Sequence, residues 1–223
     1  MKSILLTLIA VAFSALSFGQ VTEGNVNYAI EMKSDDPQMQ AQFAMLAGSK
    51  MNMYFSPEFS RVEFNMGMLM NMITVTNNKE NNAIMLMSGM MGNKAITMTS
   101  EDIEKASNPE EMPKVEITQT GEKKEILGYA CEKFILTTED GTEVAYWTTN
   151  DIVASKNNNR YMNEQVQGFP LEFEANTSGI IMSFIATEFN DSLKGKKTKE
   201  LFDMAIPEGY EEMSMEDLEK MGM

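Results

Sequence analysis

The hydrophobic and polar positions along this chain follow the pattern of short β-strands separated by polar turns. In residues 21–33, Val26, Tyr28, Ile30 and Met32 alternate with polar residues. An alternation of period two places one set of side chains on one face of a strand. Comparable apolar runs predict strands over residues 50–55, 61–66, 68–76, 83–87, 94–99, 115–119, 126–137, 142–148, 171–175 and 180–190. We therefore predict a mostly β protein built on an antiparallel sheet.

Two or three short helices are expected beside these strands. Ser34–Pro37 combines capping residues with a proline suited to a first helical turn, and Gly48 is a plausible end of that helix. The polar connector 100–114 can form one or two helical turns after a Thr or Ser cap. Each helix is short and amphipathic, so the simplest expectation is that it covers the sheet.

The segment 50–99 contains eleven of the 23 methionines of the chain. Within 66–72, methionine alternates with other residues, so these side chains point to one face of an extended strand. Methionine is flexible and polarizable, and a face built from it adapts to what it contacts. The residues predicted to form this inward-facing wall are Phe64, Met66, Met68, Met70, Met72, Met85 and Met87.

Three interpretations of this wall remain open at the level of sequence. It can bind a hydrophobic ligand such as a lipid or a lipoprotein acyl chain, since ligand sites are concave and mostly apolar. It can instead be ordinary sheet core, filled by the protein's own helices, in a structural or interaction protein of the cell envelope. Thioethers also bind copper(I), but no histidine or cysteine lies near these methionines.

Residues 1–19 have the organisation of a cleavable signal peptide. Lys2 precedes an apolar run, and Ser17 and Gly19 suit the cleavage site. The run is too short for a membrane span, no later segment is apolar for long enough, and no cysteine follows for lipid attachment. We predict an exported protein, periplasmic or secreted, with residues 20–223 as one β-rich domain without a transmembrane segment.

Charge and composition exclude several classes of function. The formal net charge is −15, which argues against binding to nucleic acid and against purely electrostatic binding to anionic membranes. Because the chain contains no histidine, it lacks the commonest general base and any His-based zinc site. Cys131 is the only cysteine, and we predict that it is buried and inert. We expect a non-enzymatic protein without cofactor, catalytic residues or metal ligands.

Several short motifs in the second half form a recognisable series. They are Gly128–Phe134 (GYACEKF), Trp147–Ile152 (WTTNDI), Gly168–Leu171 (GFPL) and Ile206–Tyr210 (IPEGY). This series resembles the secreted bacterial family known as domain of unknown function 4412. The resemblance covers 115–210, and the methionine-rich half matches by strand order alone.

The resemblance implies a curved antiparallel sheet of the lipoprotein-carrier type. Such a half-barrel has two or three helices on its concave side and a hydrophobic groove. The family has no assigned reaction, so the resemblance supplies no catalytic residue for this chain.

Overall fold

The structure is a computed structural model that describes residues 20–43, 46–67, 69–90, 92–106, 114–154, 165–177, 179–195, 197–215 and 217. The predicted signal peptide, residues 1–19, and Met68 of the predicted wall lie outside these residues. The strands are β1 (Gly24–Ser34), β2 (Lys50–Phe55), β3 (Phe59–Asn65), β4 (Met70–Asn77), β5 (Asn82–Gly89), β6 (Lys94–Met98), β7 (Val115–Ile126), β8 (Tyr129–Thr138), β9 (Glu143–Thr149), β10 (Phe169–Thr177), β11 (Ile180–Asn190) and β12 (Glu211–Met213). The helices are α1 (Pro37–Phe43), α2 (Ser100–Ala106) and α3 (Thr198–Leu201).

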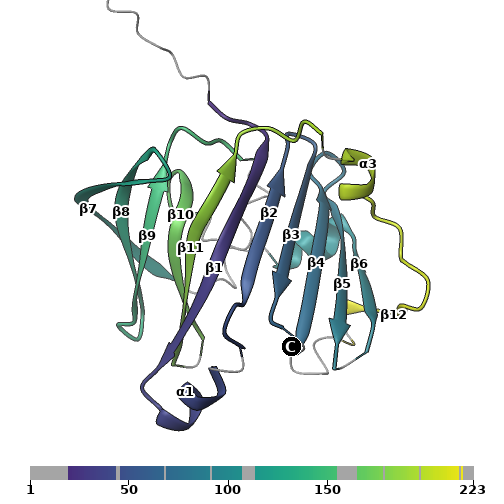
Figure 1. Cartoon of the computed structure of the whole chain (residues 1–223), viewed down its shortest axis with the longest axis horizontal. Coiled ribbons are helices and arrows are strands. Elements are labelled where there is room, and N and C mark those ends of the chain that lie inside the picture. The colour runs from purple at the N-terminus through teal and green to yellow at the C-terminus, as the bar shows by residue number, and fades with distance from the viewer. Residues whose placement is uncertain are drawn as a thin grey trace, which may run out of the picture.

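All described strands belong to one sheet of twelve, in the order β12-β6-β5-β4-β3-β2-β1-β11-β10-β9-β8-β7 (Figure 1). Strands β1 to β6 form one antiparallel meander and β7 to β11 form a second. The two meanders meet where β1 pairs with β11, with Ser34 opposite Ile180 and Asn25 opposite Asn190. At the far edge, β12 pairs with β6 in parallel.

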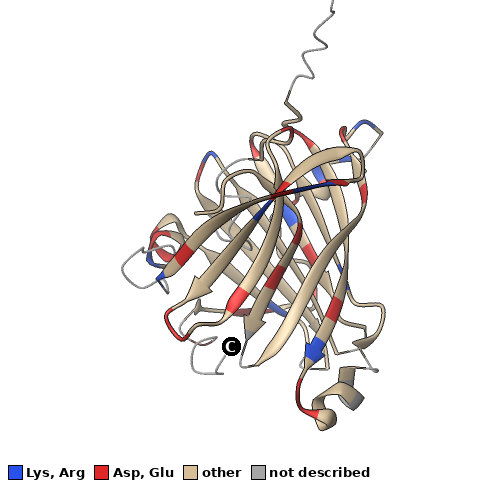
Figure 2. Cartoon of the chain, turned by 90° about the vertical axis from the view of Figure 1, so that its left-hand side faces the viewer, with Lys and Arg blue, Asp and Glu red and all other residues tan. Residues whose placement is uncertain are grey.

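The sheet is strongly curved, and its aromatic side chains identify the concave face. The ring of Phe55 on β2 lies 5.5 Å from that of Phe169 on β10, although β1 and β11 stand between them. Tyr28 on β1 reaches past β11, and its hydroxyl donates a hydrogen bond to the carbonyl oxygen of Pro170 at 2.8 Å. Side chains from strands this far apart meet only on the inside of a curved sheet. The predicted fold class, a mostly β protein with one open curved sheet, is confirmed (Figures 1 and 2).

The three helices named above are short, and two of them begin where the sequence predicts. The Asp36 carboxylate accepts a hydrogen bond from the backbone N–H of Gln38 at 2.8 Å, at the start of α1. Thr99 and Asp102 exchange side-chain to backbone hydrogen bonds at the start of α2, which is the reciprocal arrangement of a capping box. Figure 1 shows α2, drawn in teal, behind β3 and β4 on the opposite side of the sheet from α3, with α1 at the lower end.

One predicted strand boundary is wrong. The pattern predicts separate strands over 115–119 and 126–137 with a charged turn over 121–125, but β7 continues through this segment to Ile126. Gly121, with φ of 79°, lies at an irregularity in the pairing of β7 with β8. The chain reverses instead at Leu127 and Gly128, with φ of 53° and 87°. Tight hairpins favour positive φ at both central residues, and leucine gives no sequence signal for that conformation.

We predict that Phe173→Ala strongly destabilises the protein. Phe173 is 2% exposed, and its ring is stacked on Phe184 with centroids 4.5 Å apart. Removing a buried aromatic ring costs about 3–5 kcal/mol, so urea unfolding should show a loss of that size. Leu127→Ala, at a residue that is 43% exposed, should change the free energy of unfolding by less than about 0.5 kcal/mol. Equal effects of the two changes would contradict this account of the core.

Candidate functional site

The pairing of five strands places part of the predicted wall in one row. The row consists of Tyr28, Met51, Phe64, Met72 and Met87, each directly opposite the next. Directly opposite residues share a face of the sheet, so this row lies on the concave face with Tyr28. The structure thus brings together Phe64, Met72 and Met87, which lie on three consecutive strands.

A second row runs beside the first on the same face. It consists of Val26, Met53, Val62, Thr74, Met85, Ile96 and Met213. Met87 and Ile96 are buried at the centre of a cluster, and Met72, Met85, Met98, Met213 and Met215 are partly buried around them. We call Met72, Met85, Met87, Met98 and Met213 the methionine wall.

Met98, Met213 and Met215 were not predicted as wall residues. Met213 reaches the wall because β12 adds to the edge of β6, with Met213 opposite Ile96. Its segment shows neither alternation of useful length nor a turn signal, so the sequence alone indicates no strand there. Alternation in 94–99 could have identified Met98, since it falls on the same strand face as Ile96.

The other predicted wall residues lie at the borders of this cluster. Met66 and Met70 flank the turn between β3 and β4, where the Met66 N–H donates to the Met70 carbonyl oxygen at 2.9 Å. Phe64 belongs to the aromatic core, and its ring meets that of Phe184 edge-on at 6.1 Å. The methionine wall is therefore continuous with the aromatic core but begins at Met72.

Two polar groups adjoin the methionine wall. The first row continues past Met87 to Lys94, which forms an ion pair with Glu211 at the sheet edge. In the second row, Thr74 is 3% exposed, and its hydroxyl has no hydrogen-bond partner among the described residues. A buried hydroxyl without a partner is destabilising, so Thr74 offers unused hydrogen-bonding capacity inside an apolar surface.

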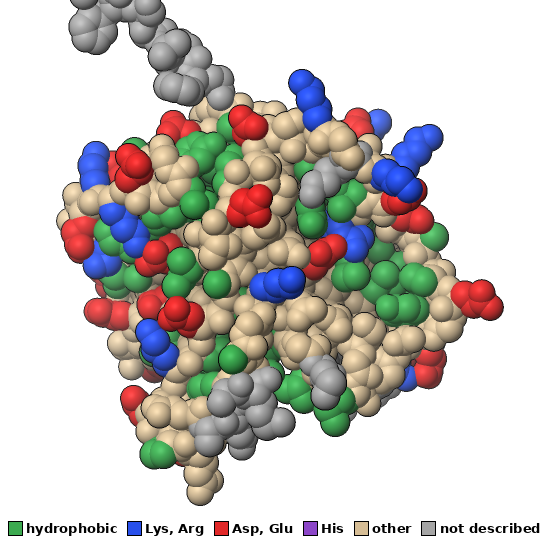
Figure 3. All heavy atoms as spheres, viewed as in Figure 1, with side chains coloured by type: hydrophobic (Ala, Val, Ile, Leu, Met, Phe, Trp, Pro, Cys, Tyr) green, Lys and Arg blue, Asp and Glu red, His purple; other side chains and the backbone are tan. Residues whose placement is uncertain are grey.

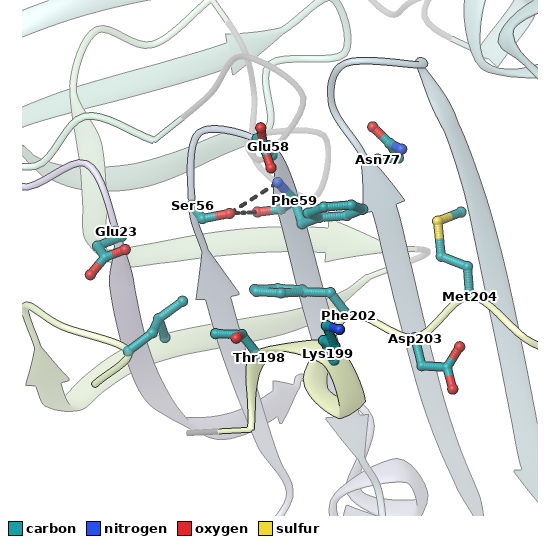
Figure 4. A pocket seen from close by; sticks show the side chains of 11 residues that line it. Glu23, Ser56, Glu58, Phe59, Asn77, Thr198, Lys199, Phe202, Asp203 and Met204 are labelled. Carbon is teal, nitrogen blue, oxygen red and sulfur yellow. Dashed lines mark hydrogen bonds between the residues drawn. The ribbon is translucent and has the colours of Figure 1, made fainter. Parts of the chain in front are cut away.

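A separate pocket of about 620 Å³ lies on the convex face, where the segment 198–204 crosses β3 and β4 (Figure 4). Phe59 and Phe202 stack in it, with ring centroids 5.6 Å apart. Arg61 secures the crossing segment, since its guanidinium donates to the carbonyl oxygen of Leu201 at 3.1 Å. Sequence analysis did not identify this pocket, because its two rings come from the first and the last third of the chain.

The lining of the convex pocket includes a serine and several charged side chains. The Ser56 hydroxyl is hydrogen bonded to the backbone of Phe59 at 3.0 and 3.1 Å. The charged side chains that line the pocket are Glu23, Glu58, Lys199 and Asp203. Among these residues no histidine or cysteine is available as base or nucleophile.

A family model described as a domain of unknown function, DUF4412, matches residues 29–210. The chain belongs to the DUF4412 family. The match extends over the methionine-rich segment, which sequence motifs alone did not tie to the family. No curated protein matches this DUF4412 protein.

The fold of this DUF4412 protein is similar to that of a solved structure titled "Structure of PNGF-II in C2 space group". The TM-score is 0.50 and the sequence identity is 13%. The match covers 89% of this chain and 32% of the other, so the DUF4412 protein spans about a third of that chain's length. At this identity the likeness concerns the fold alone.

Cys131 of the DUF4412 protein is buried, as predicted, with 1% of its surface exposed. Burial raises the pKa of its thiol from 9.0 to about 11, against a smaller lowering by Lys124. Its sulfur lies 3.6 Å from the carbonyl oxygen of Tyr129, to which the thiol donates. A reactive cysteine is exposed and has a lowered pKa, so Cys131 has the opposite character.

Two further classes of site are not found in the described part of the chain. No three His, Cys, Asp or Glu side chains there are grouped so that they could bind a metal ion. Within the residue ranges given above, none of the helices combines the length and the hydrophobicity that crossing a bilayer requires.

We predict that Cys131 reacts very slowly with a thiol reagent in the folded protein. A pKa near 11 lowers the thiolate fraction at pH 8 by roughly 100-fold relative to the unfolded chain, and burial slows the reaction further. The measurement is the labelling rate at pH 8 with and without urea. Since the pKa is higher in the folded state, the stabilising contribution of Cys131 is present below pH 9 and is lost as the pH rises towards 11. Labelling at the same rate in both states would contradict this assignment.

Proposed function

We propose that this DUF4412 protein is a non-enzymatic binding protein of the cell envelope that takes up a hydrophobic ligand, a lipid or an acyl chain, on its methionine wall. The observation that carries the proposal is the alignment of partly buried methionines from β4, β5, β6 and β12 on the concave face of a curved sheet. Binding sites for apolar ligands are concave, mostly apolar and equipped with few polar groups.

The chemistry of the methionine wall favours a flexible hydrocarbon chain. Thioether side chains have several rotatable bonds and repack around ligands of variable shape. Each methylene group removed from water contributes about 0.8 kcal/mol to the free energy of binding. A long hydrocarbon chain would therefore bind with substantial affinity without specific contacts. Thr74 and Lys94 supply the hydrogen-bond donors that a carboxyl or ester group at one end of such a ligand would require.

Export is part of the proposal. Its support is the charge, apolar run and small residues of 1–19, which are typical of a cleavable signal peptide. The protein would then act in the periplasm or outside the cell, where a lipid in transit between membranes needs a carrier. The large negative net charge of the chain favours its solubility in these compartments.

Native mass spectrometry of the protein purified without detergent from an exporting bacterial host tests the proposal. We expect the mass of residues 20–223 plus that of a phospholipid or fatty acid, which disappears on delipidation. Met72→Gln should reduce the liganded fraction several-fold, because it places an amide in the apolar wall. Met204→Gln, a control at a partly buried methionine on the convex side, should not.

Two other masses would reject the proposal. The mass of the polypeptide alone would indicate that the protein's own residues fill the concave face, as in a structural or interaction protein. Added copper ions would indicate a thioether metal site. The retained mass of residues 1–19 would show that the predicted signal peptide is not removed.

We also predict that Thr74→Val stabilises the ligand-free protein by about 1 kcal/mol, because a methyl group replaces a buried hydroxyl without a partner. The same variant should retain less ligand. Thr148→Val is the matched control, since the Thr148 hydroxyl donates to the Gln167 carbonyl oxygen at 2.7 Å, and its loss should destabilise by about 1 kcal/mol. Urea unfolding measures both changes. Destabilisation by Thr74→Val would show that its hydroxyl has a structural partner.

A further inference from the structure

Two exposed apolar side chains lie side by side at one end of the methionine wall. Leu69, before β4, is 44% exposed, and Met90, after β5, is 77% exposed. Met70 is paired with Gly89, two residues beyond the pair Met72 and Met87 along the same two strands. Figure 3 shows hydrophobic side chains gathered at the lower edge of the molecule, below β3 and β4.

The backbone fixes this arrangement. The Met90 N–H donates to the Leu69 carbonyl oxygen at 3.3 Å. Gly89 has a φ of 139°, and a Cβ there would lie 2.5 Å from that same oxygen. Only glycine permits so close an approach of the two turns, and the approach holds Leu69 and Met90 together as one tip.

The two turns of this tip contain no charged residue, in a strongly acidic protein. Residues 64–79 and 81–100 contain no Asp or Glu, although the chain carries a net charge of −15. The lysine nearest to Met90 in sequence, Lys94, is neutralised by Glu211. Asn65, Asn71 and Asn93 flank the two turns. Exposed apolar side chains on turns of this composition can enter a lipid interface without burying a charge of their own.

We propose that Leu69 and Met90 insert into the interface of a zwitterionic phospholipid bilayer and bring the adjoining end of the methionine wall to the membrane surface. The biological purpose of this insertion rests on the proposed function, since a lipid or acyl chain could then pass between the bilayer and the methionine wall. The acidic surface would oppose attraction to anionic lipid, so insertion depends on apolar burial and not on charge. Two exposed apolar side chains provide too little area for a stable protein interface, whereas they are sufficient to enter a fluid lipid interface.

Flotation of the purified protein with phosphatidylcholine vesicles tests the inference. We expect binding that raised salt does not weaken, because screening acts on charges. Met90→Asp or Leu69→Asp should lower the partition coefficient at least about tenfold, as expected for withdrawing a large apolar side chain from lipid. Leu127→Asp and Val153→Asp should leave it within about twofold. These controls are about as exposed as Leu69, and strand pairing places them at the other end of the sheet.

A spectroscopic readout makes the test independent of the aspartate variants. Met90→Trp should show a blue-shifted emission on addition of phosphatidylcholine vesicles, and Leu127→Trp should not. Absence of binding, equal loss in the Leu127→Asp control, or binding restricted to anionic vesicles and abolished by salt would overturn the inference. Vesicle binding by a protein that carries no ligand in native mass spectrometry would reject the proposed function and leave membrane docking established.

Discussion

The pairing of β1 with β11 is the interaction on which the rest of this structure depends. It joins two antiparallel meanders from the two halves of the chain into one sheet. The curvature of that sheet lets Tyr28 reach Pro170 and Phe173 across an intervening strand. These contacts fix the orientation of the two meanders relative to each other. The joining of the two halves into one concave face therefore follows from a long-range pairing, whereas the methionine rows follow from the pairing of successive strands.

The concave face is divided between two kinds of side chain. Around β10 and β11 it is built from stacked rings, of which Phe173 and Phe184 are the closest pair. Around β4 to β6 it is built from methionines. Packed rings have few alternative arrangements, whereas thioethers have many. The first region supplies a rigid core, and the second supplies a surface that can change shape without unfolding the sheet.

The C-terminal segment has two roles in this arrangement. Phe202, Met204, Ile206 and Tyr210 cover apolar residues on the convex side of β4 to β6. The segment then adds β12 to the exposed edge of β6, where an unpaired strand would otherwise offer hydrogen-bonding groups to other chains. It thus covers one face, protects one edge and delivers Met213 to the other face.

The sequence by itself determined most of the strands, the side of each predicted strand on which its methionines lie, and the absence of histidine chemistry. These properties are local, because a period of two is readable within six or eight residues. Tertiary structure alone decided that Met213 joins the wall, that Phe59 meets Phe202, and that Leu69 touches the turn of Met90. Strand order and the course of the terminal segment arise from pairing between distant segments, and such pairing leaves no periodic trace in either partner.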